Sequence, residues 1–289
     1  MGKRLSAAEI ASFARDGYVT RIPILELAEL AELRRRIAEF ERGHAGEVAW
    51  AFDIKCNLLF DWVVAAGASE RMLDAVEDLI GPNILMTDAV FRIKEPGSAV
   101  LYDWHQDSAR IRVEPCFIIG YLAVSPATVA NGCLEVVPGT HREVQPFHVV
   151  ENAPGQDQRR VARVSTPDPQ RARQLELSPG EVAFFSGNLV HSSGPNRSAA
   201  RRVAILYDYT AAHARQSVGR GSGQLVRGRD EWHHFAHEPF PGPDFTPALA
   251  AERRRILRAY PENPLMGPRE PKAPLRFPDA REGPYAEQL

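Results

Sequence analysis

Two histidines, a carboxylate and an arginine are the residues of this sequence whose types and spacing could do chemistry. His105 and Asp107 stand two positions apart, and on an extended strand such side chains point to the same face. Both can therefore reach one metal ion. We select His191 as the third ligand, because it follows an apolar strand and a tight turn from which an antiparallel sheet could bring it back.

Two histidines and one carboxylate that leave coordination positions open form a facial triad, which is typical of non-haem Fe(II) oxygenases. A His and an Asp two positions apart also occur by chance, as a pair on a surface strand. On these residues alone two other classes stay open. One is a non-enzymatic, cupin-like barrel that binds a metal or a ligand, and the other is a zinc-dependent hydrolase or isomerase.

Three blocks of sequence surround these residues: Trp104–Asp107, Asn131–His141, and His191–Ser198 continuing to Arg202. In this order, over roughly Met86 to Tyr209, the chain resembles the phytanoyl-CoA dioxygenase family of Fe(II)- and 2-oxoglutarate-dependent oxygenases. The resemblance implies that His105, Asp107 and His191 are the iron ligands and the catalytic residues. It also implies that Arg202, Ser193 and Tyr102 bind the co-substrate 2-oxoglutarate.

The arginine is chosen by its spacing from the second histidine. The family places an arginine eleven residues after that histidine, which selects Arg202 rather than its neighbour Arg201. A guanidinium offers a permanently charged, bidentate fork to the far carboxylate of 2-oxoglutarate. Neither the binding protein nor the zinc enzyme needs a carboxylate-binding arginine there, so His191 and Arg202 together favour the oxygenase.

The resemblance implies that dioxygen and 2-oxoglutarate drive hydroxylation of an unactivated C–H bond, with release of succinate and CO2. Halogenating relatives carry a small residue in place of the carboxylate ligand, and here Asp107 is present. Desaturation or cyclisation by the same centre stays open. Arg110, close after the metal residues, could bind an acid group, so we expect a small polar or acid-bearing metabolite of secondary or catabolic metabolism. The alternative is a solvent-facing or acid-paired arginine.

The elements that must position these residues fall into three segments. Residues 1–82 are predicted to form a helical layer: a helix opened by Ser6 and Glu9, an amphipathic helix with a stripe from Ile24 to Phe40, and a helix over Ser69–Ile80. Residues 83–210 are predicted to form the β core. Its apolar segments are Ile84–Lys94, Pro115–Val124, Cys133–Val137, Glu181–Phe185 and Arg202–Tyr209.

We therefore predict a mainly β fold with a helical layer (α+β), in which a double-stranded β-helix, or jelly roll, carries the site. The 289 residues are expected to form one domain. Residues 211–289 form an extension with one helix over Pro247–Tyr260 and eleven of the 23 prolines. We expect this extension to act as a lid or as the contact of a homodimer.

Composition limits the partners and the compartment. The net charge of −2 argues against nucleic acid or an anionic membrane as a partner, and no segment has the length of an apolar membrane span. Three cysteines without a CxxC pair suit a reducing cytoplasm. His233 and His237 stand four apart, but no helical pattern surrounds them, so we expect packing rather than a second metal site.

Overall fold

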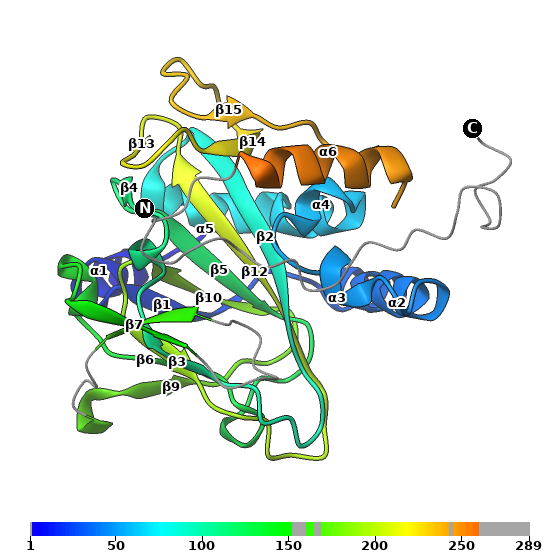
Figure 1. Ribbon diagram of the computed structural model, residues 1–289. Helices are drawn as coiled ribbons and strands as arrows, with labels where there is room; N and C mark the ends of the chain where they lie inside the picture. Colours follow the sequence, from blue (N-terminus) through cyan, green and yellow to red (C-terminus); the bar gives the residue numbers. More distant parts are fainter. Residues whose placement is uncertain (1, 152–159, 165–168, 243–244, 260–289) are drawn as a thin grey trace, which may run out of the picture.

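The computed structural model describes residues 2–151, 160–164, 169–242 and 245–259. Figure 1 shows a strongly curved β core with helices along one side of the long strands. The helices are α1 (Ala7–Asp16), α2 (Leu27–Gly43), α3 (Val48–Ala51), α4 (Asp61–Gly67), α5 (Glu70–Ile80) and α6 (Pro247–Arg258). Short 3-10 turns are η1 (Cys56–Leu58), η2 (Asp107–Ala109), η3 (Val129–Asn131), η4 (Thr140–Arg142) and η5 (Pro169–Arg171).

The predicted helices are present, and their local signals act as expected. Ser6 and Glu9 form a reciprocal capping box at the start of α1, and Gly17 ends that helix in the left-handed conformation. Ser69 precedes α5. The expected stripe on α2 is wrong at its start, because Leu27 is 85% exposed and Ile24 precedes the helix. The Ile24 amide donates to the Gly180 carbonyl, so the chain is still extended there.

The large sheet has seven strands. In spatial order they are β1 (Tyr18–Pro23), β10 (Glu181–Ser186), β5 (Ile118–Ala123), β12 (Arg202–Ala211), β2 (Ile84–Lys94), β14 (Ser222–Arg227) and β15 (Ala236–His237). Neighbours pair antiparallel except β14 with β15. The outer strand β1 comes from the segment predicted to be helical, and β14 and β15 come from the extension.

The smaller sheet has four antiparallel strands, β3 (Tyr102–His105), β11 (His191–Ser193), β6 (Leu134–Val136) and β9 (Arg173–Leu175), in that spatial order. Two further pairs are β4 (Val113–Glu114) with β13 (Arg215–Gln216), and β7 (Phe147–Glu151) with β8 (Arg160–Val164). β8 lies between the predicted strands Cys133–Val137 and Glu181–Phe185, where no strand was expected. The two main sheets form the predicted jelly roll, and the fold class is confirmed.

Strand β12 shows how the core is divided. Val203, Ile205 and Tyr207 pack with the helices, whereas Ala204 and Leu206 pack in the interior between the sheets. The Tyr207 hydroxyl donates to the Val63 carbonyl of α4 at 3.0 Å, which ties the helical layer to the sheet. Because side chains alternate along a strand, the interior face of β12 also carries its charged residues.

The described part of the extension ends at residue 259, after α6. That helix begins at Pro247 as predicted, with the Thr246 hydroxyl accepting from the Leu249 amide. Residues 260–289 lie outside the described residues, so the expected lid or homodimer contact stays a prediction. Among the helices that the structure describes, none combines the length and the apolar character that a membrane span requires.

Candidate active site

His105, Asp107 and His191 bring their side chains to one point at the smaller sheet. One ligand atom from each lies within 4.8 Å of the other two. The Nε2 atom of each imidazole lies 3.5 Å from an Asp107 carboxylate oxygen. Atoms that each bind one ion at about 2.1 Å must lie within about 4 Å of one another, and the distances between these three side chains are close to that limit. Within the described part of the chain, no second group of three such residues is found.

Strand pairing places the two histidines side by side. His191 lies opposite His105 in the antiparallel pair of β11 and β3, and their ring centroids are 4.2 Å apart. The His191 ring lies 5.0 Å from that of Phe185 in the large sheet, so it faces the interior. Strand β3 ends at His105, and Asp107 opens the turn η2. The carboxylate therefore reaches the imidazoles from a turn and not from a continuous strand.

The protonation states suit a metal ligand set. The Nδ1 atoms of His105 and His191 lie 2.6 and 2.9 Å from the carbonyls of Asp103 and Leu189, which leaves each Nε2 for a metal. Burial, and then the nearby His105, lowers the pKa of His191 to about 4. Burial opposes ionisation of Asp107, but the two imidazoles outweigh it and hold its pKa below the usual range. A carboxylate therefore faces the neutral imidazole of His191 at neutral pH.

Arg202 is buried at the start of β12, with 1% of its surface exposed. Its Nη1 donates to the Gly132 carbonyl and, at 3.0 Å, to the Ser193 hydroxyl. Its Nε has no hydrogen-bond partner among the described residues. An unfilled N–H group on a buried cation is costly, and a carboxylate oxygen is the group that relieves it best. The site therefore fits an anion beside Arg202.

Gly132 fixes the position of this arginine. It has a φ of +74°, and a Cβ added to it would lie 2.1 Å from the Gly194 carbonyl oxygen. Only glycine fits there, because a side chain would force β6 away from the end of β11. The Gly132 carbonyl accepts from Arg202 and from the Ser193 hydroxyl, the latter at 2.8 Å. The glycine thus aligns both residues.

Lys94 joins this group, although sequence analysis did not single it out. It is fully buried and lies opposite Arg202 in the pairing of β2 with β12. Its Nζ donates to the Ser193 hydroxyl at 2.7 Å, to the Ser193 carbonyl at 3.1 Å and to the Gly194 carbonyl. Two buried cations therefore contact one serine. One feature of the sequence could have identified Lys94: it ends an apolar strand, and lysine is rare in this chain, which has only four.

Two tyrosines border the cations. The guanidinium carbon of Arg202 lies 6.0 Å from the ring centroid of Tyr121 on β5, whose buried hydroxyl has no hydrogen-bond partner in the described residues. Tyr102, which sequence analysis predicts at the site, lies with its ring 5.2 Å from Arg92 and 5.4 Å from Lys94. Tyr121 was missed because an aromatic residue in an apolar strand normally indicates packing.

Other predicted residues lie at the edge of the site or away from it. Arg110 is half-buried directly after η2, three residues beyond Asp107. Arg201 points elsewhere and forms ion pairs with Glu41 at 2.5 Å and Glu95 at 2.9 Å. His237 lies 2.9 Å from the carboxylate of Asp230 and is not part of the metal-ligand group.

Similar proteins agree with this geometry. A probable phytanoyl-CoA dioxygenase of Caenorhabditis elegans is 33% identical over 147 residues, which are 48% of this chain and 47% of that protein. A probable alpha-ketoglutarate-dependent hypophosphite dioxygenase of Stutzerimonas stutzeri is 28% identical over 57% of this chain and 59% of its own length. The chain thus spans about half the length of these curated relatives.

A solved structure supports the fold. The non-heme monooxygenase ThoJ, in its apo form, superposes with a TM-score of 0.76 at 23% identity, over 86% of this chain and 95% of that one. The two packed sheets and the His–Asp–His group are typical of non-haem iron oxygenases. Residues 13–204 match the model of the phytanoyl-CoA dioxygenase (PhyH) family, and the chain belongs to that family.

Proposed function

We propose that this protein is an Fe(II)- and 2-oxoglutarate-dependent dioxygenase that hydroxylates an unactivated C–H bond of a small polar or acid-bearing metabolite. Succinate and CO2 are the co-products. The observation that carries the proposal is the approach of three metal-ligand atoms to within 4.8 Å of one another, in an interior that also holds a buried arginine with an unfilled N–H group.

His105, Asp107 and His191 hold the iron in this proposal. Two imidazoles and one carboxylate leave positions open for 2-oxoglutarate and dioxygen. When bound, the iron supplies the activation of dioxygen for C–H oxidation. The carbonyls of Asp103 and Leu189 orient the imidazoles through their Nδ1 atoms. Because Asp107 occupies a ligand position, hydroxylation is favoured over halogenation.

The group around Ser193 holds the far carboxylate of 2-oxoglutarate. Arg202 offers its unfilled Nε, and Lys94, which also donates to the Ser193 hydroxyl, adds a second positive charge. The Tyr121 hydroxyl, which lacks a partner among the described residues, can donate to the same carboxylate. Tyr102 packs beside Lys94 and shapes the wall. These residues bind and orient the co-substrate and exclude water from it.

The substrate is proposed to carry an acid group that Arg110 binds at the edge of the site. The Stutzerimonas relative is named for hypophosphite, a small anion, and this supports a small acidic substrate. The described cysteines, Cys56, Cys116 and Cys133, are all unpaired, and we propose a reducing cytoplasm as the place of action.

The test is an anaerobic optical titration of metal-free protein with Fe(II) and then with 2-oxoglutarate. We expect a visible charge-transfer band that requires both additions and is absent in His105→Ala. His148→Ala serves as the matched control, because His148 is exposed on β7, and it should retain the band. The method reports the ligand set without knowledge of the substrate.

Other results of this titration would contradict the proposal. Tight binding of zinc without a band would indicate a metal-dependent hydrolase or isomerase. Binding of Fe(II) with no response to 2-oxoglutarate would indicate a binding protein that uses its metal only for stability.

The role of Arg110 is tested separately. Once small acids have been screened by succinate release, Arg110→Ala should raise the KM for an acidic substrate about tenfold and leave that for 2-oxoglutarate unchanged, because a charge-assisted hydrogen bond is lost. Arg112→Ala is the control, since Arg112 is exposed. An unchanged substrate KM in Arg110→Ala would show that this arginine does not bind the substrate.

A further inference from the structure

A small cavity lies in the interior, toward the end of β12 that is remote from Arg202. Its volume is about 30 Å³. The lining residues are Thr87, Ile111, Val113, Phe117, Asp208, Gln216, Gly221, Ser222 and Phe235. Ile111 and Val113 follow the metal-site residue Asp107 by only four and six positions. The cavity is lined in part by the segment after η2 and by the extension, and Asp107 is close enough to Asp208 to influence it electrostatically.

Asp208 supplies the carboxylate of this cavity. Six residues after Arg202, it lies on the same interior face of β12, about 20 Å along the strand. Among the described residues, its carboxylate has neither a hydrogen-bond donor nor an ion-pair partner. Its backbone carbonyl accepts from the Thr87 hydroxyl at 3.3 Å, so the strand itself is held in place. The side chain is thus the part that lacks a partner.

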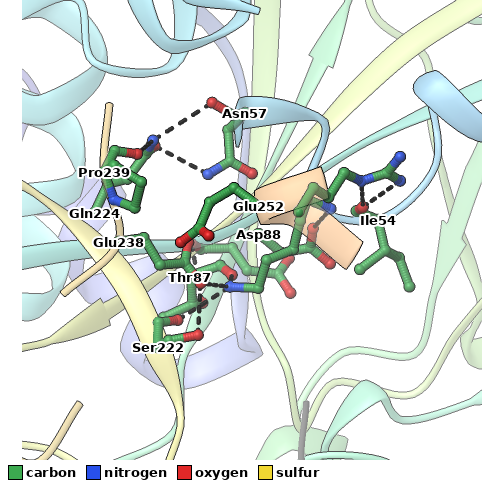
Figure 2. Close-up of polar contacts among 12 residues, drawn as sticks. Ile54, Asn57, Thr87, Asp88, Ser222, Gln224, Glu238, Pro239 and Glu252 are labelled. Carbon is green, nitrogen blue, oxygen red and sulfur yellow. Dashed lines mark hydrogen bonds and ion pairs between the residues drawn. The ribbon is translucent and has the colours of Figure 1, made fainter. Parts of the chain in front are cut away.

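Lys55, one of the two cations that influence Asp208, does not pair with it. Lys55 directs its Nζ to the Thr87 carbonyl, to the Ser222 carbonyl at 3.1 Å and to Glu238. Its backbone amide donates to Asp88, the residue opposite Asp208 in the sheet, at 2.6 Å. Figure 2 shows Thr87, Asp88, Ser222 and Glu238 gathered in this network. Asp88 is therefore satisfied, and its neighbour across the strands is not.

The surroundings make an ionised Asp208 unfavourable without a ligand. Burial, and then the negative charges of Asp88 and Asp107, raise its pKa well above the usual range, against weaker opposing effects of Arg92 and Lys55. A cation bound in the cavity would reverse this balance, because it pairs with the carboxylate in a poorly solvated place. A neutral or anionic group gains no such advantage.

We propose that Asp208 binds an ammonium group of the substrate, which makes this residue a determinant of specificity. This inference rests on the proposed function. A cavity of this size holds one or two water molecules, and hence only a small head group such as a primary ammonium. With Arg110 bound to an acid group, the substrate class becomes a small amino acid or another zwitterion.

The experiment uses the full chain without metal and three small probes: ethylammonium chloride, ethanol and sodium acetate at equal ionic strength. Calorimetric titration should detect binding of ethylammonium, with ethanol and acetate at least tenfold weaker. Asp208→Asn should weaken ethylammonium binding at least tenfold and leave ethanol unchanged. Glu114→Gln is the matched control, because Glu114 is an exposed carboxylate next to the lining residue Val113. It should bind ethylammonium like the parent protein.

A second variant tests the proposal independently, in case Asp208→Asn does not fold. Val113→Phe fills the cavity without a change of charge and should also abolish ethylammonium binding. Equal binding of ethylammonium and ethanol, or unchanged binding in either variant, would overturn the proposal.

The same protein loaded with Fe(II) and 2-oxoglutarate separates the two hypotheses. Ethylammonium should shift the visible band of the parent protein but not that of Asp208→Asn. If the band forms and ethylammonium has no effect on it, the inference fails and the proposed function stands. If ethylammonium binds through Asp208 but no band forms, the ammonium site stands and the oxygenase proposal fails.

Discussion

Two buried polar regions of this protein differ in how their charges are satisfied. In the network around Lys55, the ammonium group donates to two backbone carbonyls and to the carboxylate of Glu238, which also accepts from Ser222. Between the sheets, the Nε of Arg202 has no hydrogen-bond partner among the described residues. Neither oxygen of the Asp208 carboxylate has one there either. Lys55 and Arg202 are both buried and Asp208 is half-buried, so exposure does not account for the difference between the two cations.

The difference separates structural charges from binding charges. A paired buried charge joins elements, and Lys55 links η1 to β2, β14 and the segment after β15. An unpaired buried charge lowers stability unless a ligand completes it. Proteins accept such a cost mainly at functional sites. The contrast therefore assigns the Lys55 network to stability and the residues between the sheets to binding.

The largest effect is expected from breaking the satisfied network. Lys55→Met leaves Glu238 buried without its cation, and should lower the free energy of unfolding by about 3–5 kcal/mol. This corresponds to roughly 10 °C or more in Tm for a domain of this size. Thermal and denaturant unfolding of the metal-free protein measure it. Lys55→Met with Glu238→Leu should recover much of the loss, because no charge is then left unpaired.

Lys3→Met is the surface control for this change. Lys3 pairs with Glu77 where the lysine side chain is 56% exposed, so the change should cost at most about 1 kcal/mol. A Lys55→Met protein as stable as Lys3→Met would remove the distinction between the two regions.

A smaller effect, on binding and not on folding, is expected at the arginine. Arg202→Ala should raise the Kd for 2-oxoglutarate about 10- to 100-fold, because a charge-assisted contact worth about 1.5–3 kcal/mol is lost, and should leave Fe(II) affinity nearly intact. Arg201→Ala is the matched control, since its guanidinium is paired with Glu41 and Glu95. Optical titration with 2-oxoglutarate measures both, and a swap of the two results would show that the spacing rule selects the wrong arginine.

The smallest effect is a pH dependence that arises from Asp208. Its pKa is raised in the folded protein by burial and by Asp88 and Asp107, while Arg92 and Lys55 oppose the rise. The folded state then holds a proton that the unfolded state releases near pH 4. Its contribution to stability is therefore complete below that pH and declines as the pH rises toward the folded-state pKa.

Asp208→Asn removes this decline. The difference in free energy of unfolding between the variant and the parent protein should grow in favour of the variant from pH 5 to pH 8, as measured by urea denaturation. Asp230→Asn is the control: burial raises the pKa of that carboxyl, but hydrogen bonds from backbone amides and His237 outweigh burial and lower it. Its contribution to stability is therefore complete above about pH 4, and the difference should not vary from pH 5 to pH 8. A difference for Asp208→Asn that does not vary with pH would mean that its carboxyl is already compensated.

The sequence by itself determined the fold class, the family and the segments that meet at the site. Short apolar segments bounded by turn residues predict strands such as Ile84–Lys94 locally, and capping residues such as Ser6 predict helix ends. His105, Asp107, His191 and Arg202 were identified because their motif and spacing are local features of the chain. Their roles as ligands remain predictions, although the structure brings the first three together.

The tertiary structure alone decided which buried charges are satisfied. Lys55 and Glu238 are 183 residues apart in the sequence, and no local pattern indicates their pairing. The strands that carry Lys94, Tyr121 and Asp208 have sequences that indicate packing. These residues belong to the site only because the pairing of distant strands places their side chains in the space between the two sheets. The partners of a buried group come from elements that are remote in sequence. Whether a buried charge is paired therefore depends on how these elements pack in the tertiary structure.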